Sequence, residues 1–130
     1  MTQLELKVHP VWQDLTSIVE NIDSDALIRE HLDACKYKIC GYWDEEDKYY
    51  EEIILPSMLE SDLVSSSIGF MGKERFLKLK FIITTKVDTF DRLSHQMQRI
   101  GEVVLIYNEN LDFLDEHWVL NVDAPALKVK

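Results

Sequence analysis

The first third of the chain has apolar residues at the spacing of an α-helix. After Pro10, which suits a first helical position, apolar residues recur every three or four positions as far as Ile22. A second run with the same period follows Asp23 or Ser24, either of which can cap a helix, and ends near Cys35. The pattern predicts two short amphipathic helices in succession. The residues before Pro10 fit a short edge strand or the run-in to the first helix.

The period then changes to that of β-strands. Tyr37–Trp43 and Tyr49–Leu55 are rich in aromatic and β-branched residues, and the polar run Asp44–Asp47 between them suits a hairpin connection. Pro56 ends the second strand. The stretch 57–74, with a run of three serines and two glycines, is interpreted as a loop with at most a turn or two of helix.

The second half of the chain mixes strands with one more predicted helix. Arg75–Thr85 is the clearest strand, because apolar residues alternate along it. Beyond Asp88, four apolar residues at helical spacing predict a helix that Asp88 caps and Gly101 ends. Glu102–Tyr107 and Trp118–Val122 predict two further strands.

This order predicts an α+β fold. We expect two N-terminal helices and an antiparallel or mixed sheet of about five strands, with one further helix packed on the sheet. The 130 residues suffice for one core and contain no linker, so residues 1–130 are predicted to form a single globular domain. No apolar run approaches the roughly 20 residues that span a membrane, and Met1–Pro10 has no features of a secretion signal. Two cysteines, five positions apart, favour the reducing cytoplasm.

The acidic residues are unevenly distributed. The net charge is −10, from 24 acidic and 14 basic residues. Residues 20–62 hold thirteen acids and four bases, so this third of the chain carries −9. Such a charge argues against binding nucleic acid through its phosphates and against an anionic membrane surface.

The chain carries no motif that specifies a reaction. G-x-G-x-x-G and G-x-S-x-G are absent, and Gly69–Lys73 lacks the spacing of a phosphate-binding loop. His31 and Cys35 share a helix face, but a structural zinc site needs four ligands, so we interpret the pair as bordering the core. The acidic run Asp112–His117 lacks the turn glycine of a calcium loop. The sequence therefore predicts no catalytic residue, no metal and no cofactor.

The strongest functional signal is the acidic and aromatic segment of the predicted hairpin. Carboxylates around exposed aromatic rings suit a protein interface in which the rings supply binding energy and the charges steer the encounter. A basic protein is the complementary partner, and a nuclease is one example because its own site must be positive to hold phosphates. The predicted contact residues are Trp43, Asp44, Glu45, Glu46, Asp47, Tyr49, Glu51 and Glu52.

We therefore expect a small acidic cytoplasmic protein that neutralises a basic partner by stoichiometric binding, as an immunity protein or antitoxin inhibits a toxin nuclease. Four alternatives stay open. The acidity could serve solubility alone, or the acids could mimic a nucleic acid. A small enzyme or ligand-binding domain would have a pocket between sheet and helices, lined by Trp43, His95, Tyr107 and Trp118. An adaptor subunit of a larger assembly would self-associate.

Overall fold

Three helices open the chain in this computed structural model, which describes residues 1–88 and 95–130 and, for side chains, residues 1–86 and 97–130. Thr2 and Glu5 form a reciprocal capping box on the first helix, and the Asp23 carboxylate accepts from the Ala26 N–H to cap the third. Asp25 ties the third helix to the sheet, because its Oδ1 accepts from both the N–H and the hydroxyl of Ser61, at 2.7 and 3.0 Å. The helices are α1 (Gln3–Lys7), α2 (Pro10–Asn21) and α3 (Ser24–Ala34).

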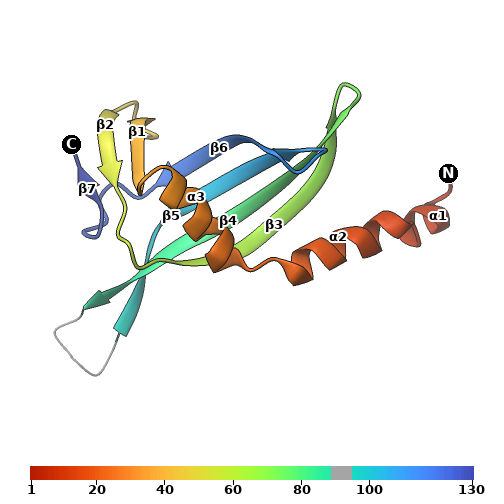
Figure 1. Cartoon of the computed structure of the whole chain (residues 1–130), viewed down its shortest axis with the longest axis horizontal. Helices are drawn as coiled ribbons and strands as arrows, with labels where there is room; N and C mark the ends of the chain where they lie inside the picture. The colour runs from red at the N-terminus through yellow and green to blue at the C-terminus, as the bar shows by residue number, and fades with distance from the viewer. Residues whose placement is uncertain (89–94) are drawn as a thin grey trace.

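The strands form two antiparallel sheets (Figure 1). A small sheet has the order β1-β2-β7, and a larger meander has the order β3-β4-β5-β6. The α+β class predicted from the sequence is confirmed. The strands are β1 (Lys38–Trp43), β2 (Tyr49–Ile54), β3 (Glu60–Met71), β4 (Glu74–Asp88), β5 (His95–Asn108), β6 (Phe113–Leu120) and β7 (Lys128–Val129).

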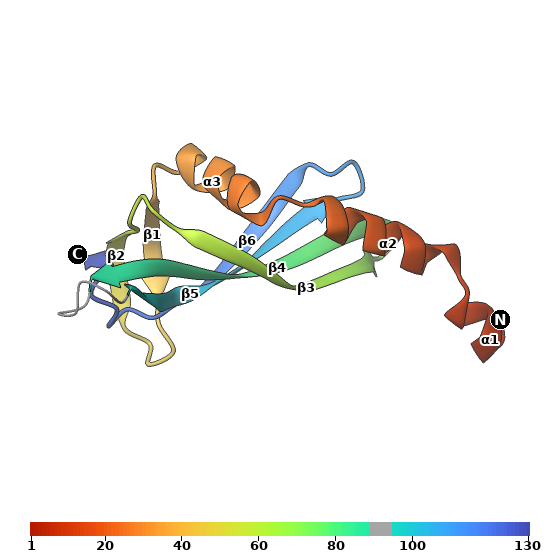
Figure 2. The same cartoon turned by 90° about the horizontal axis from the view of Figure 1, so that it is seen from below.

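The core lies between one face of the larger sheet, α3 (Figure 2) and the small sheet, which contributes Ile39, Tyr42, Tyr50 and Ile53. Alternation along β4 buries Leu77, Leu79, Phe81 and Ile83 on this face, as the sequence pattern predicted. The small sheet sits at one end of the larger one (Figure 1). A bond of 2.9 Å from the Leu120 N–H to the buried Tyr42 hydroxyl joins β6 to β1 across the two sheets.

Two sequence predictions were wrong. Residues 95–100, predicted to lie in a helix that begins at Asp88 and ends at Gly101, form the start of β5; residues 89–94 of that prediction lie outside the described residues. The predicted loop 57–74 instead contains β3. In both cases the decisive partner is β4, which pairs with β3 on one side and with β5 on the other, and the local apolar spacing does not report this pairing.

The chain before Pro10 forms a short helix of its own, α1, which is neither the edge strand nor the simple run-in to the next helix that the sequence suggested. The α1 helix and the first half of α2 extend beyond the sheet (Figures 1 and 2), and neither helix contains a buried residue. Within residues 1–88 and 95–130, no helix has the length and apolar character needed to cross a membrane.

Candidate functional site

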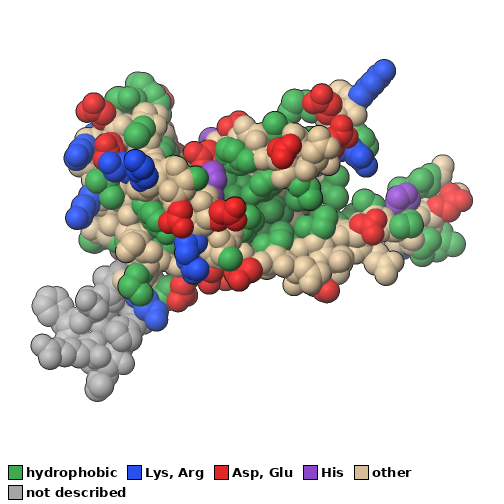
Figure 3. Space-filling view, in the orientation of Figure 1, with side chains coloured by type: hydrophobic (Ala, Val, Ile, Leu, Met, Phe, Trp, Pro, Cys, Tyr) green, Lys and Arg blue, Asp and Glu red, His purple; other side chains and the backbone are tan. Residues whose placement is uncertain are grey.

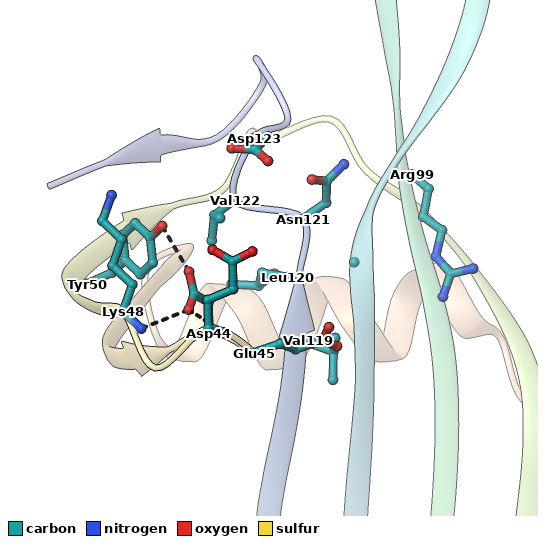
Figure 4. Close-up of a pocket in the computed structure, with 12 residues that line it drawn as sticks. Asp44, Glu45, Lys48, Tyr50, Arg99, Val119, Leu120, Asn121, Val122 and Asp123 are labelled. Carbon is teal, nitrogen blue, oxygen red and sulfur yellow. Dashed lines mark hydrogen bonds between the residues drawn. The ribbon is translucent and has the colours of Figure 1, made fainter.

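The predicted hairpin exists, and Asp44 organises its loop. The Asp44 Oδ1 atom accepts from the backbone N–H groups of Glu46 and Lys48, at 2.9 and 2.8 Å. Its Oδ2 atom accepts from the Tyr50 hydroxyl at 3.2 Å (Figure 4). Asp47 closes the turn with a left-handed backbone, φ 60°. Asp44 therefore shapes the loop from within rather than projecting from it.

These hydrogen bonds affect the ionisation of Asp44 and Tyr50. The bond from the Lys48 backbone N–H is the main cause that lowers the pKa of Asp44 below its ordinary value of 3.8. Burial, followed by the bond to Asp44, raises the pKa of the Tyr50 hydroxyl. The pair is thus a carboxylate and a neutral phenol that donates to it.

The exposed face of the hairpin carries a pair of aromatic rings. Trp43 and Tyr49 are cross-strand partners, their ring centroids lie 5.0 Å apart, and the residues are 62% and 51% exposed. Alternation along β2 places Glu51 on the same face as Tyr49. Glu45, Glu46 and Asp47 are exposed in the adjoining loop. We call these six residues, Trp43, Glu45, Glu46, Asp47, Tyr49 and Glu51, the acidic hairpin surface.

The hairpin changes its buried face along its length, and this explains which aromatics are exposed. Ile39 and Ile53 are a buried cross-strand pair near the base, whereas Tyr42 and Tyr50, of opposite parity, are the buried pair near the tip. Gly41 lies between the two levels with φ 69°, a backbone conformation that a glycine adopts without strain. Trp43 and Tyr49 consequently point to solvent at the tip.

Glu52, the remaining predicted contact residue, lies on the other face of β2. Its side chain is only 22% exposed, and its Oε1 atom is 3.9 Å from Nζ of Lys38. Six of the eight predicted residues are therefore exposed on the hairpin, with Trp43, Tyr49 and Glu51 on one face of its strands and Glu45, Glu46 and Asp47 in its loop. Asp44 supports that surface, and Glu52 lies apart from it.

A cavity of about 520 Å³ opens beside the hairpin loop (Figure 4). The loop supplies Glu45 and Glu46 to its lining, and the segment after β6 supplies Asp123. None of these three carboxylates has a Lys or Arg partner within the part of the chain that the structure describes. Arg99 lies across the opening (Figure 4), and its guanidinium is 3.0 Å from the Glu102 carboxylate. Asp44 and Lys48 also line the cavity, so its wall holds four carboxylates and two cationic side chains and has a net negative charge.

Sequence reasoning missed Asp123. It lies 79 positions after Asp44 and has no local motif. Its place follows from tertiary structure, because the bond between Leu120 and Tyr42 brings the end of β6 against the hairpin.

The other residues singled out in the sequence lie elsewhere. His31 contacts the Glu116 carboxylate, which also accepts from the Trp118 indole N–H at 3.1 Å, so this cluster fastens α3 to β6. The Cys35 thiol donates to the Leu32 carbonyl at 3.4 Å. Among the described residues, no three His, Cys, Asp or Glu side chains gather as a metal site.

The alternative pocket does not assemble among the described side chains. Trp43 is exposed on the hairpin, Trp118 is buried in β6, and Tyr107 packs edge-on to Phe113 with ring centroids 6.2 Å apart. The side chain of His95, the fourth predicted lining residue, lies outside the described side chains.

No family model, no curated protein and no solved structure matches the chain. Function is therefore inferred from the surface itself.

Proposed function

We propose that this protein binds a basic protein through the acidic hairpin surface and Asp123, and neutralises that partner stoichiometrically. An immunity protein or antitoxin that covers the active site of a toxin nuclease would act in this way. One observation carries the proposal: an exposed Trp43–Tyr49 ring pair lies at the tip of a hairpin whose loop presents the exposed carboxylates of Glu45 and Glu46.

The ring pair supplies what a protein interface needs for affinity. Trp and Tyr are the residues that most often dominate binding energy when they become buried in an interface. Here the cross-strand register sets their positions, and β2 is held on both sides, by β1 and by β7. A surface that is already ordered loses little conformational entropy on binding.

The carboxylates favour a basic partner. Glu45, Glu46, Asp47, Glu51 and Asp123 are exposed and can meet Lys or Arg side chains. Such charges raise the association rate and select the partner by charge, while the anchors govern dissociation. A nuclease fits because its substrate site must be positive to hold phosphates, and that same site is what an acidic inhibitor would cover.

The test begins with capture of partners from a lysate at low salt, with elution by rising salt, and continues with the purified partner. Trp43→Ser should raise the dissociation constant by at least about 30-fold, which corresponds to a loss of about 2 kcal/mol for a central aromatic anchor. Reversal of Glu45 and Glu46 to Lys should lower the association rate and flatten its dependence on salt.

Trp12→Ser is the matched control for this test, because Trp12 is equally large, is 57% exposed and lies on α2. It should leave the affinity for the partner unchanged. Addition of the wild-type protein should also abolish the partner's own activity at a one-to-one ratio. An affinity and an association rate that change neither with salt nor on reversal of Glu45 and Glu46 would overturn the proposal.

A further inference from the structure

The N-terminal arm, residues 1–14, presents an apolar surface that nothing in the described chain covers. It contains α1 and the first turn of α2, and it extends beyond the sheet (Figures 1 and 2). Helices this short are marginal in water unless an apolar face packs against something. Its exposed large apolar side chains are Met1, Leu4, Leu6, Val8, Val11 and Trp12.

The arm is ordered by contacts within itself. The Thr2–Glu5 capping box fixes the start of α1, and the Trp12 indole N–H donates to the Leu6 carbonyl at 2.8 Å, which fastens α1 to α2. Because the polar atom of Trp12 is already satisfied, its ring is free to act as an apolar anchor.

An apolar groove lies close to the base of the arm. It has a volume of about 250 Å³ and opens between α2 and the ends of β3, β4 and β5. Figure 3 shows hydrophobic side chains gathered in a hollow between α2 and the sheet. Arg75 and Glu109, whose side chains are 3.3 Å apart, form its polar rim. Its apolar walls are Ile18, Ile68, Phe76, Leu77 and Leu111.

Leu111 is an unusual residue for its position. It is 63% exposed and has a left-handed backbone with φ 64°, where Gly, Asn or Asp is the ordinary residue. The equivalent position of the β1–β2 loop holds Asp47. A strained backbone that retains an exposed leucine at the mouth of a groove points to a contact made by that side chain.

We propose that a second copy of this chain occupies the groove, and that two copies exchange their arms so that each Trp12 ring enters the groove of the other. Trp12 precedes Ile18, a wall of the groove, by six residues, about 9 Å along the same helix. An arm therefore cannot reach its own groove unless α2 breaks. Two α2 helices that run antiparallel about a two-fold axis near Leu15 bring each Trp12 beside the second copy's Ile18, and this symmetric contact closes as a dimer.

The charges agree with this arrangement. Two copies of a −10 chain repel each other, so contact requires a region outside the acidic third. Residues 1–19 hold only two acids and one base, and the two charged residues that line the groove, Arg75 and Glu109, pair with each other. The arm, at −1, therefore meets a groove whose lining carries no net charge, so this contact avoids the repulsion of the acidic third.

The experiment is a measurement of mass against concentration by sedimentation equilibrium. The wild-type chain should dimerise, and Trp12→Ser and Leu111→Ser should each raise the dimer dissociation constant at least about 30-fold. Trp43→Ser, which removes an equally exposed indole at the other end of the molecule, should leave the dimer intact. Far-UV circular dichroism of each variant checks that the fold is retained.

Mixing the two defective variants separates arm exchange from other modes of association. A Trp12→Ser homodimer and a Leu111→Ser homodimer each contain no intact arm–groove contact, whereas their mixed dimer contains one. The mixture should therefore dimerise more tightly than either variant alone. A wild-type chain that stays monomeric, a dimer indifferent to Trp12→Ser, or a mixture no tighter than its components would overturn the inference. Each result is independent of whether Trp43 binds a basic partner.

Discussion

Two loops of this protein use the same side-chain device. In the β5–β6 loop the Asn108 Oδ1 atom accepts from the N–H groups of Asn110 and Asp112, both at 2.9 Å. In the β1–β2 loop the Asp44 Oδ1 atom accepts from the N–H groups two and four residues later. An amide oxygen and a carboxylate oxygen therefore accept the same pair of backbone hydrogen bonds, and only the carboxylate is charged.

The first prediction separates those two contributions at Asp44. Asp44→Asn should keep the loop and nearly the full stability at pH 7, whereas Asp44→Ala should destabilise the protein clearly, because the loop N–H groups lose their acceptor. A lowered pKa stabilises the fold fully above the ordinary value of 3.8, and this stabilisation is lost as the pH falls through the lower folded-state value. Urea midpoints between pH 7 and pH 2.5 should therefore fall less with acid in Asp44→Asn than in the wild type. Equal destabilisation by both variants at pH 7 would contradict this account.

The second prediction concerns the left-handed backbone of Leu111. Leu111→Gly should raise the free energy of unfolding by about 1 kcal/mol, because glycine adopts positive φ without the steric cost that leucine bears. The measurement is a urea titration in a Trp12→Ser background, which removes any contribution from self-association. Gly72→Ala, which imposes a side chain at φ 64° on an open turn, is the reverse control and should lower stability by a similar amount. Destabilisation by Leu111→Gly would show that the leucine side chain holds the loop.

Elements with local signals could be predicted from the sequence, and elements defined by pairing with another strand could not. The helices from Pro10 and Ser24 and the strand from Arg75 follow from their own periodicity. The β5 strand was predicted in part as a helix because its first residues continue an apolar spacing near 3.6, yet pairing with β4 determines their conformation. Gly101, interpreted as a helix stop, is in fact required where β5 passes close to β6.

The third prediction tests that requirement. A Cβ atom at Gly101 would lie 2.5 Å from the Val119 backbone carbonyl oxygen, so Gly101→Ala forces β5 and β6 apart and should cost about 2–3 kcal/mol. Gly69 is the matched control, since its added Cβ would meet only the ring of Phe76, which is half-buried and can turn aside. Gly69→Ala should therefore cost less than about 1 kcal/mol. Similar losses for both variants in thermal unfolding would contradict the close approach of β5 and β6.

The candidate site, too, could be predicted from the sequence only in part. Composition and the strand–turn–strand pattern were enough to select the hairpin, but strict alternation could not tell which aromatics face solvent, because the buried face changes at Gly41. The structural use of Asp44 was also hidden, since an acid that accepts backbone N–H groups resembles any other acid in a charged run. The position of Asp123 beside the hairpin could not be predicted either, because it depends on the contact between the two sheets.

At the scale of the molecule, the two proposed surfaces lie at opposite ends. The β1–β2 hairpin is at one end and the N-terminal arm is at the other (Figure 1). Exchange of arms would therefore leave both acidic hairpins of a dimer accessible. Such a dimer would bind two basic partners independently, at one partner per chain.

The last prediction follows from the concentration of charge. Residues 20–62 carry −9 of the net −10, so carboxylates close in sequence repel one another in the folded state. Raising ionic strength from about 0.01 to 0.15 M shortens the screening length from about 30 to 8 Å. The melting temperature should therefore rise by a few degrees, about the effect of 1 kcal/mol on a domain of this size.

A combined Glu45→Gln and Glu46→Gln variant should start from a higher melting temperature at low salt and gain less from added salt. Glu74→Gln, in the positive stretch 63–80, should do neither. Salt would thus stabilise the protein and weaken its complex with a basic partner, because repulsion within the chain and attraction to the partner come from the same carboxylates. A melting temperature that falls with salt would mean that ion pairs such as Lys80–Glu102 outweigh the repulsion.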